Sequence, residues 1–351
     1  MRRYGWLILA LVLLVLASYL MRAGEKLKLG ANDERQVNFP RFATPAEYER
    51  SSKRRTLLTM RETSATEPKV VEKRDPLLAV LPANAPFGVV IEANAIRNSP
   101  IGEMLLACTG TAGADKIAEL KKETGFDPLT DLDRVAVVGE SVMMTGNFGG
   151  LDRANMEKEL GAPTTYGDKA RIYKNDNEAV AVWNDEMMLA AKTSEELQHS
   201  IDVLEGRKPP PESPTISENM AYGEAYGKLS VELLTRMLPE EDGLKDKVRE
   251  AIEGVELHAT TFGDVALVAK LDGSDSEKVE ELARSLGGAL ALFRLQAKKE
   301  GGKEGEDLAE LLDLARIERQ GSGTFSVELA LPLSYVKKKL GPCADKVVLP
   351  D

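Results

Sequence analysis

The two histidines, His199 and His258, are the side chains best suited to proton transfer near neutral pH. His258 alternates with apolar residues along 255–260, so it shares one face of a predicted strand with Glu256 and Thr260. A Glu–His–Thr row has the groups for general acid–base chemistry. No nucleophile motif such as G-x-S-x-G accompanies it, however, and a solvated strand face explains the same pattern. His199 lies off the apolar stripe of its predicted helix, and we predict no catalytic residue.

A glycine-rich segment, residues 110–116 (GTAGADK), opens a predicted helix and superficially suggests a phosphate loop. It lacks the G-x-x-x-x-G-K-[ST] spacing, and Asp115 would place a negative charge where a phosphate should lie. The segment therefore predicts a lead-in to a helix, with no cofactor-binding residue and no cofactor.

Two aspartate clusters have the side chains that Ca²⁺ prefers. Asp127, Asp131 and Asp133 lie in DPLTDLD, and Asp272 and Asp275 lie in DGSDS. Neither cluster has the EF-hand pattern of alternating ligands with a closing glutamate. Aspartates at turns and helix caps need no metal, so we predict no metal site.

Methionines and aromatic residues leave a site for an apolar ligand open. Met143-Met144 and Met187-Met188 fall on predicted strands, and Phe293 and Leu295 fall on a predicted helix near Gly287-Gly288. Because methionine adapts to varied surfaces, a groove between sheet and helices could hold a lipid or a peptide. Methionine on a strand is more often part of the core.

An uncharged stretch near the N-terminus, Tyr4–Met21, is the main evidence in the sequence for the cellular location of this protein. Eighteen helical residues span about 27 Å, close to the ~30 Å hydrocarbon core of a bilayer. Arg2 and Arg3 precede the stretch. We predict a single membrane-spanning anchor over residues 1–21 with a cytoplasmic N-terminus, and a body in the periplasm or an equivalent compartment. The lipid bilayer would then be a partner through this anchor. A cleaved secretory signal is the alternative, although no A-x-A site follows Met21.

The charge is unevenly distributed along the 351 residues. Residues 1–75 carry 15 Lys and Arg against 9 Asp and Glu, and the remainder carries 31 against 48. The hydrophobic content of 43% predicts a globular body. An acidic body repels nucleic acid, so nucleic-acid binding is excluded as a function.

Two cysteines, Cys108 and Cys343, permit one disulfide in an oxidising compartment. Cys108 also follows an apolar run, which suits a buried free cysteine. Sequence does not give the distance between them, so both interpretations stay open. Neither residue belongs to a C-x-x-C pair, which leaves zinc binding and thioredoxin-like chemistry without support.

Composition and turn signals divide the chain. Residues 22–75 read as a basic, flexible tether, with one helix expected over 45–60 because Thr44 and Glu47 form a capping box around Pro45. Two halves follow, separated by a proline-rich linker. The predicted boundaries are 76–206 for the first half, 207–217 for the linker, 218–343 for the second half and 344–351 for a tail.

The order of predicted elements is similar in the two halves: strand, helix, helix, paired strands, helix. Short turns between adjacent strands favour antiparallel pairing. We therefore predict the α+β class, with an N-terminal transmembrane helix followed by a tandem duplication of strand–helix–helix–hairpin–helix units with mainly antiparallel sheets.

One segment, GFDPLTDLDRV at residues 125–135, resembles a segment of uncharacterised, membrane-anchored bacterial envelope proteins with a tandem α+β body. The resemblance extends over residues 76–340. It implies the fold and the location of such proteins, and it implies no activity.

The anchor, the tether and the lack of a chemical motif together predict a non-enzymatic binding or interaction module in the cell envelope. Its partner would be a protein or an apolar ligand. The alternative is a membrane-bound hydrolase with an acidic active site that no motif reveals, which would require two buried carboxylates converging in a cleft. A purely architectural protein, the third possibility, would lack an exposed apolar patch.

Overall fold

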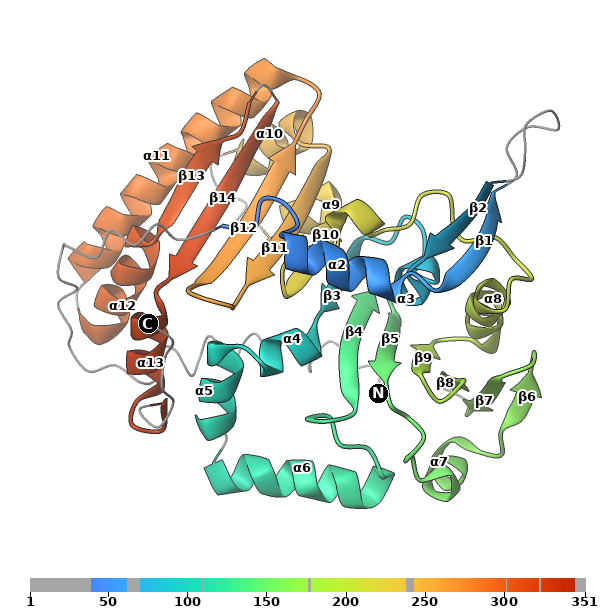
Figure 1. Ribbon diagram of the computed structural model, residues 1–351. Coiled ribbons are helices and arrows are strands. Elements are labelled where there is room, and N and C mark those ends of the chain that lie inside the picture. The colour runs from blue at the N-terminus through green and yellow to red at the C-terminus, as the bar shows by residue number, and fades with distance from the viewer. Residues whose placement is uncertain are drawn as a thin grey trace. The chain divides into compact units, whose positions relative to one another are not determined.

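The computed structural model (Figure 1) describes residues 39–61, 70–108, 110–175, 178–237, 243–300, 302–321 and 323–344. The chain forms two compact units, each built from separate segments. Among the described residues, unit 1 takes those up to Arg41, those within Ile96–Gly110 and those from Leu234 to Ala344. Unit 2 takes Phe42–Ala95 and Thr111–Leu233. Both units combine helices with antiparallel strands.

Unit 1 contains a sheet with the strand order β13-β14-β12-β11, and the pairs are antiparallel. Its longest helix, α11, packs on β13 and β14 and has α12 as a neighbour. The strands are β11 (Gly254–Thr260), β12 (Val265–Asp272), β13 (Ala315–Arg319) and β14 (Thr324–Leu331). The helices are α5 (Pro100–Cys108), α10 (Leu244–Ala251), α11 (Ser276–Glu300), α12 (Gly302–Asp313) and α13 (Leu333–Leu340). In sequence, α4 (Ala93–Arg97) and α9 (Val231–Met237) span the unit boundaries.

A disulfide between Cys108 and Cys343 closes one side of unit 1. It joins the end of α5 to the segment after α13, across 235 residues of sequence. Beside it, Ile101 and Met104 of α5 pack in one apolar cluster with Tyr335 of α13 and its neighbours. The disulfide interpretation of the two cysteines is therefore the correct one.

Unit 2 contains a sheet with the strand order β10-β3-β4-β5-β9-β8-β7-β6. Helix α8 packs on β7, β8 and β9, and its apolar side chains at Leu197, Ile201 and Leu204 are buried there. The strands are β3 (Phe87–Ile91), β4 (Leu132–Val138), β5 (Ser141–Gly146), β6 (Thr164–Tyr166), β7 (Ala170–Lys174), β8 (Ala179–Trp183), β9 (Met187–Ala191) and β10 (Ala225–Leu229). The helices are α2 (Pro45–Arg54), α3 (Pro76–Ala79), α6 (Gly110–Thr124, whose first residue belongs to unit 1), α7 (Arg153–Leu160), α8 (Ser194–Leu204) and the 3₁₀ helix η1 (Glu218–Met220).

Two features differ from the sequence-based expectation. The predicted fold class included a membrane-spanning helix, and this is wrong for the described residues, where no helix is both long and apolar enough to cross a membrane. Helix α11 has the length, with 25 residues, but it carries charges in its first and last turns and at Arg284 and Arg294. The stretch Tyr4–Met21 itself lies outside the described residues.

The second difference concerns the helix expected over 45–60. Its capping box forms as predicted, with Thr44 and Glu47 each accepting from the other's backbone N–H. The helix ends at Arg54, however, and Leu57–Arg61 forms β1, which pairs with β2 (Val70–Arg74). The partner strand begins with two β-branched residues, Val70 and Val71, which favour a strand and lie opposite Arg61 and Met60.

A buried ion pair lies in the interior of unit 2. Arg134 on β4 is 4% exposed and donates from Nη1 and Nη2 to the two carboxylate oxygens of Asp75, at 2.6 and 3.0 Å. Burial acts to lower the pKa of Arg134, but the charge of Asp75 and its hydrogen bonds outweigh this and raise the pKa. Asp75 is also the N-cap of α3, since it accepts from the Leu77 backbone N–H at 2.9 Å.

We expect Arg134→Ala to lower the free energy of unfolding by roughly 3–5 kcal/mol, because it leaves the Asp75 carboxylate buried without its counter-charge. Urea denaturation measures the loss. The matched control is Arg153→Ala, which removes a surface pair with Asp185 and should cost about 0–1 kcal/mol. Equal losses in the two variants would show that the buried Asp75–Arg134 pair contributes no more to the free energy of unfolding than a surface pair does.

A second ionic cluster holds the end of α8. Asp202 accepts hydrogen bonds from Tyr166 at 2.9 Å and from Arg207 at 2.8 Å, and pairs with Lys208 at 3.0 Å. Burial, the largest influence, raises the pKa of Asp202, but the hydrogen bonds from Lys208, Arg207 and Tyr166 together lower it from 3.8 to about 2. The Arg207 guanidinium also lies over the Tyr166 ring, 5.2 Å from its centroid.

Because the pKa of Asp202 is depressed by folding, its ionised form stabilises the protein above pH 3.8, and this contribution is lost as the pH falls from 3.8 to about 2. Asp202→Asn should therefore lower the Tm near neutral pH, and the gap to the wild type should close over that acid range. The control is Asp246→Asn, which alters an exposed pair with Arg249. A gap for Asp202→Asn that persists unchanged at low pH would contradict the assignment.

Candidate functional site

The histidine row on β11 combines one buried side chain with two that are partly buried. His258 is buried, and its Nε2 lies 4.0 Å from Glu256 Oε2. The neighbouring His258, followed by the charge of Lys270, holds the pKa of Glu256 below its usual range despite burial. The prediction of a solvated face is wrong for His258, because burial along β11 does not alternate strictly: Val255 and His258 are both buried. His199 is exposed on α8, off its apolar face.

Three of the aspartates singled out in the sequence serve turns and helix caps, whereas Asp133 on β4 pairs with Arg54 and Asp272 on β12 accepts from Thr324. Asp127 accepts from the Leu129 backbone N–H at 2.9 Å, and Asp131 accepts from the Asp127 N–H at 2.8 Å. Asp275 accepts from the N–H groups of Glu277 and Lys278 at the start of α11. Within the described residues, no group of three potential His, Cys, Asp or Glu ligands could hold a metal ion.

The glycine-rich segment and the methionine pairs are structural too. Helix α6 already begins at Gly110, so the glycine-rich segment is helical where a phosphate loop would be needed. Met143 and Met187 are buried in the main core of unit 2, and Met144 and Met188 pack against a second cluster there. The interpretation of these methionines as core residues is confirmed.

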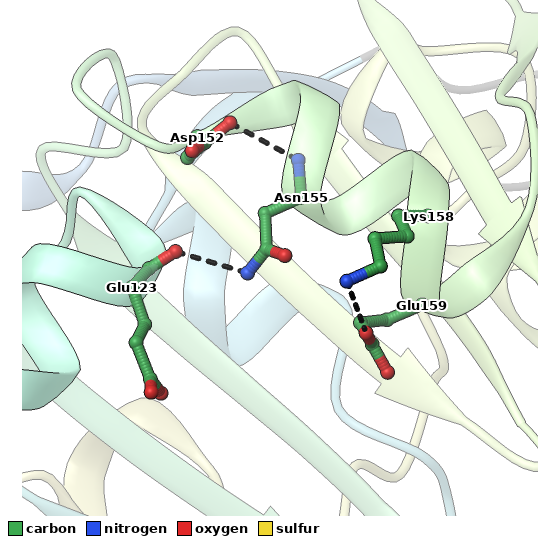
Figure 2. A pocket seen from close by; sticks show the side chains of 5 residues that line it. All are labelled: Glu123, Asp152, Asn155, Lys158 and Glu159. Atoms are coloured by element: carbon green, nitrogen blue, oxygen red, sulfur yellow. Dashed lines mark hydrogen bonds and ion pairs between the residues drawn. The ribbon is translucent and has the colours of Figure 1, made fainter.

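An open hollow of about 420 Å³ lies between the end of α6 and helix α7, and its lining is polar. Figure 2 shows that Asn155 donates to the Glu123 backbone oxygen, while Asp152 accepts from the Asn155 backbone N–H. Lys158 pairs with Glu159 on the same helix. These side chains hold one another and the cap of α7. The hollow offers no apolar wall for a lipid or drug-like ligand.

The feature that stands out for binding is an apolar surface on α11 and α12. It consists of Leu292, Phe293 and Leu295 on α11, which are 68%, 56% and 65% exposed, and Leu308 on α12, which is 47% exposed. We call these four residues the α11–α12 apolar surface. Single exposed apolar residues are normal on proteins, but three within four positions of one helix are a concentrated exposure.

The helix itself explains why these side chains face outward. In the first half of α11, Val279, Leu282 and Ala283 follow the i, i+3, i+4 spacing and are buried. Past Gly287-Gly288, Ala297 is the residue that stays buried, and the run Ala289–Phe293 is apolar on every side of the helix. A helix cannot bury all its faces against one layer, so part of this run faces outward.

Polar contacts fix this second half of α11 in its orientation. Arg294 Nε donates to the Leu312 backbone oxygen at 2.8 Å, and Arg294 also donates to the Ala315 backbone oxygen. Lys298 pairs with Asp313 at 3.0 Å. Figure 1 shows α12 beside α11, as these contacts require. The outward direction of Leu292 and Leu295 is therefore held in place by their polar neighbours.

Sequence reasoning named Phe293 and Leu295 as candidates for an apolar site, and the structure places both on this surface. It missed Leu292 and Leu308. The signal for Leu292 was the unbroken apolar run ALALF, whereas Leu308 joins the surface only through the packing of α12 on α11.

Comparison with known proteins assigns no family. No family model matches the chain, and no curated protein matches it. Among solved structures, crystal forms IV, III and I of TP0453 are similar at TM-scores of 0.40, 0.42 and 0.38 with 11–12% identity. They cover 72–75% of this chain and 91–96% of TP0453. Similarity at this level supports no conclusion about function.

Proposed function

We propose that this protein is a non-enzymatic binding module that holds an apolar surface of a protein partner against the α11–α12 apolar surface. The observation that carries the proposal is the exposure of Leu292, Phe293 and Leu295 within four residues of one helix. Burying a side chain of this kind stabilises a fold or a complex by about 1.5–3 kcal/mol. In the isolated chain these side chains are exposed to water, so a partner that buries them gains this free energy.

The shape of this surface favours a protein over a small apolar ligand. Small ligands bind in enclosed clefts that cover most of their area. The four residues instead lie on the outer faces of two helices, and the hollow beside α7 is polar. A bilayer is disfavoured by charge: residues 76–351 carry 31 Lys and Arg against 48 Asp and Glu, which an anionic lipid surface repels.

The hydrolase alternative gains no support from the described residues. It requires two buried carboxylates that converge in a cleft. Among the described residues, five carboxylates are buried: Asp75, Glu92, Asp202, Glu224 and Glu328. Asp75, Glu92, Asp202 and Glu328 are each paired with an arginine in the folded protein, which occupies the carboxylate. An architectural protein without a ligand would be expected to lack an exposed apolar surface, so the α11–α12 surface speaks against that possibility as well.

We further propose that the body lies outside the cytoplasm, in the periplasm or an equivalent compartment. The Cys108–Cys343 disulfide supports this location, because such bonds persist in oxidising compartments and are rare in the cytosol. The acidic body also agrees with a soluble domain of the cell envelope rather than with a nucleic-acid-binding protein.

If the location is right, a thiol-alkylating reagent added to the protein isolated without reductant should leave Cys108 and Cys343 unlabelled. Reduction should make both reactive. The variant Cys343→Ser should lose roughly 2–5 kcal/mol of stability in urea denaturation, since the bond closes a long loop of the unfolded chain. Complete labelling of native protein without reductant would contradict the proposed compartment.

The binding proposal is tested by photo-crosslinking in cells. A photoreactive amino acid at position 292 or 295 should capture the same protein, and Phe293→Gln should abolish capture at both positions because it removes apolar area from the contact. Phe262, which is 56% exposed in the β11–β12 turn of the same unit, is the control position and should not capture that protein.

Three results would overturn the binding proposal. One is capture of the same species from position 262 as from 292. Another is binding of purified protein to anionic or neutral vesicles that Phe293→Gln abolishes, which would identify a bilayer as the occupant. The third is self-association that Phe293→Gln abolishes, which would identify a second copy of the chain.

A further inference from the structure

Helix α2 is attached to unit 2 through polar contacts. It has no buried residue. Arg54 and Arg55, at its C-terminal end, pair with Glu92 and Glu218, and Glu47, in its first turn, accepts from the Gly223 backbone N–H at 2.7 Å. Because ionic contacts of partly exposed groups weaken as salt rises, the attachment of α2 should depend on ionic strength more than the sheet beneath it does.

The contact of Arg54 differs from an ordinary surface pair. Its Nη1 donates to both carboxylate oxygens of Glu92, at 2.9 and 2.7 Å, and Glu92 is only 3% exposed. The hydroxyl of Tyr226, a buried residue on β10, donates to the same carboxylate at 3.3 Å. Asp133 supplies a second carboxylate, 3.5 Å from Arg54 Nη2. Arg54 thus inserts a guanidinium from the surface into an acidic site that unit 2 provides.

The site belongs to the sheet, whereas its occupant belongs to α2. Glu92 directly follows β3, and its backbone N–H donates to the Glu224 oxygen just before β10, so the carboxylate is held by two paired strands. If α2 leaves, a buried carboxylate remains without its cation, which is costly. A guanidinium from elsewhere would relieve this cost, and it suits the site better than an ammonium because it is planar and has several donors.

We propose that α2 is a releasable strap and that Arg54 occupies a binding site for an arginine side chain of a partner protein. When the strap leaves, an arginine presented by the partner pairs with Glu92 and Asp133 in place of Arg54. The proposal goes beyond the binding function assigned to the α11–α12 apolar surface. That surface lies in unit 1 and this site lies in unit 2, so either can fail without the other.

The site is tested by replacing Arg54 and adding back its functional group. Arg54→Ala should lower the Tm, and millimolar ethylguanidinium should raise it again in a saturable manner. The rescue should be weaker with ethylamine and absent in Arg54→Ala/Glu92→Gln. Lys53→Ala is the control, because Lys53 pairs with the exposed Glu49 on the same helix. Ethylguanidinium should not raise the Tm of Lys53→Ala or of the wild type.

A Tm of Arg54→Ala that ethylguanidinium leaves unchanged, or raises equally in the double variant, would overturn the arginine site. The strap is tested on the wild-type chain by hydrogen exchange, which is informative even if Arg54→Ala does not fold. Raising NaCl from 0.05 to 0.5 M should speed exchange of the α2 amides about tenfold while β3 and β4 stay protected. Exchange of α2 that is independent of salt would show that the helix is not releasable.

Discussion

The buried pair between Asp75 and Arg134 is the constraint on which the interior of unit 2 depends. Asp75 caps α3 and accepts hydrogen bonds from Nη1 and Nη2 of Arg134. Its own backbone N–H donates to the Glu218 carboxylate at 3.1 Å. Glu218 also pairs with Arg55 at the end of α2. A charge inside a protein must be compensated by an opposite charge or by hydrogen bonds. Here such contacts lead from Arg134 on β4 through Asp75 and Glu218 to Arg55 at the end of α2. The position of α2 is therefore a consequence of charges in the core.

Unit 1 also contains a buried carboxylate that is paired with arginine, Glu328 on β14. This fully buried glutamate accepts from Arg41, Arg316 and Ser326 at 2.7–2.9 Å. Burial acts to raise its pKa, but the hydrogen bonds from Arg316, Ser326 and Arg41 hold the pKa below its usual range. In each unit, then, an arginine from the segment 41–54 reaches a buried glutamate. Polar contacts of this kind fix the position of a segment even where that segment has few apolar side chains.

Sequence patterns predicted what depends on local chemistry. The capping box predicted at Thr44 and Glu47 forms, and the antiparallel pairing expected of neighbouring strands is present in both units. The long-range features escaped prediction, because no local signal marks Glu92 or Glu328 as buried, or pairs Asp75 with Arg134 across 59 positions. For the candidate site, the apolar run on α11 was visible, but the exposure of Leu292 depends on which face packs on the sheet.

The two units share a strand order, so comparing them shows which features occur in unit 1 alone. The order β4-β5-β9-β8 in unit 2 corresponds to β11-β12-β14-β13 in unit 1, each with a helix after the first hairpin. In unit 2 that helix is α7, whose eight residues place Met156 and Leu160 against a core cluster. In unit 1 it is α11, with 25 residues. The connection in unit 2 continues from α7 through β6 and β7, whereas in unit 1 it continues from α11 through α12. Because α7 has only eight residues, the later turns of α11, which carry Leu292, Phe293 and Leu295, have no helical counterpart in unit 2. The exposure of apolar side chains on these turns is therefore the feature of unit 1 on which our proposal of a contact with a protein partner rests.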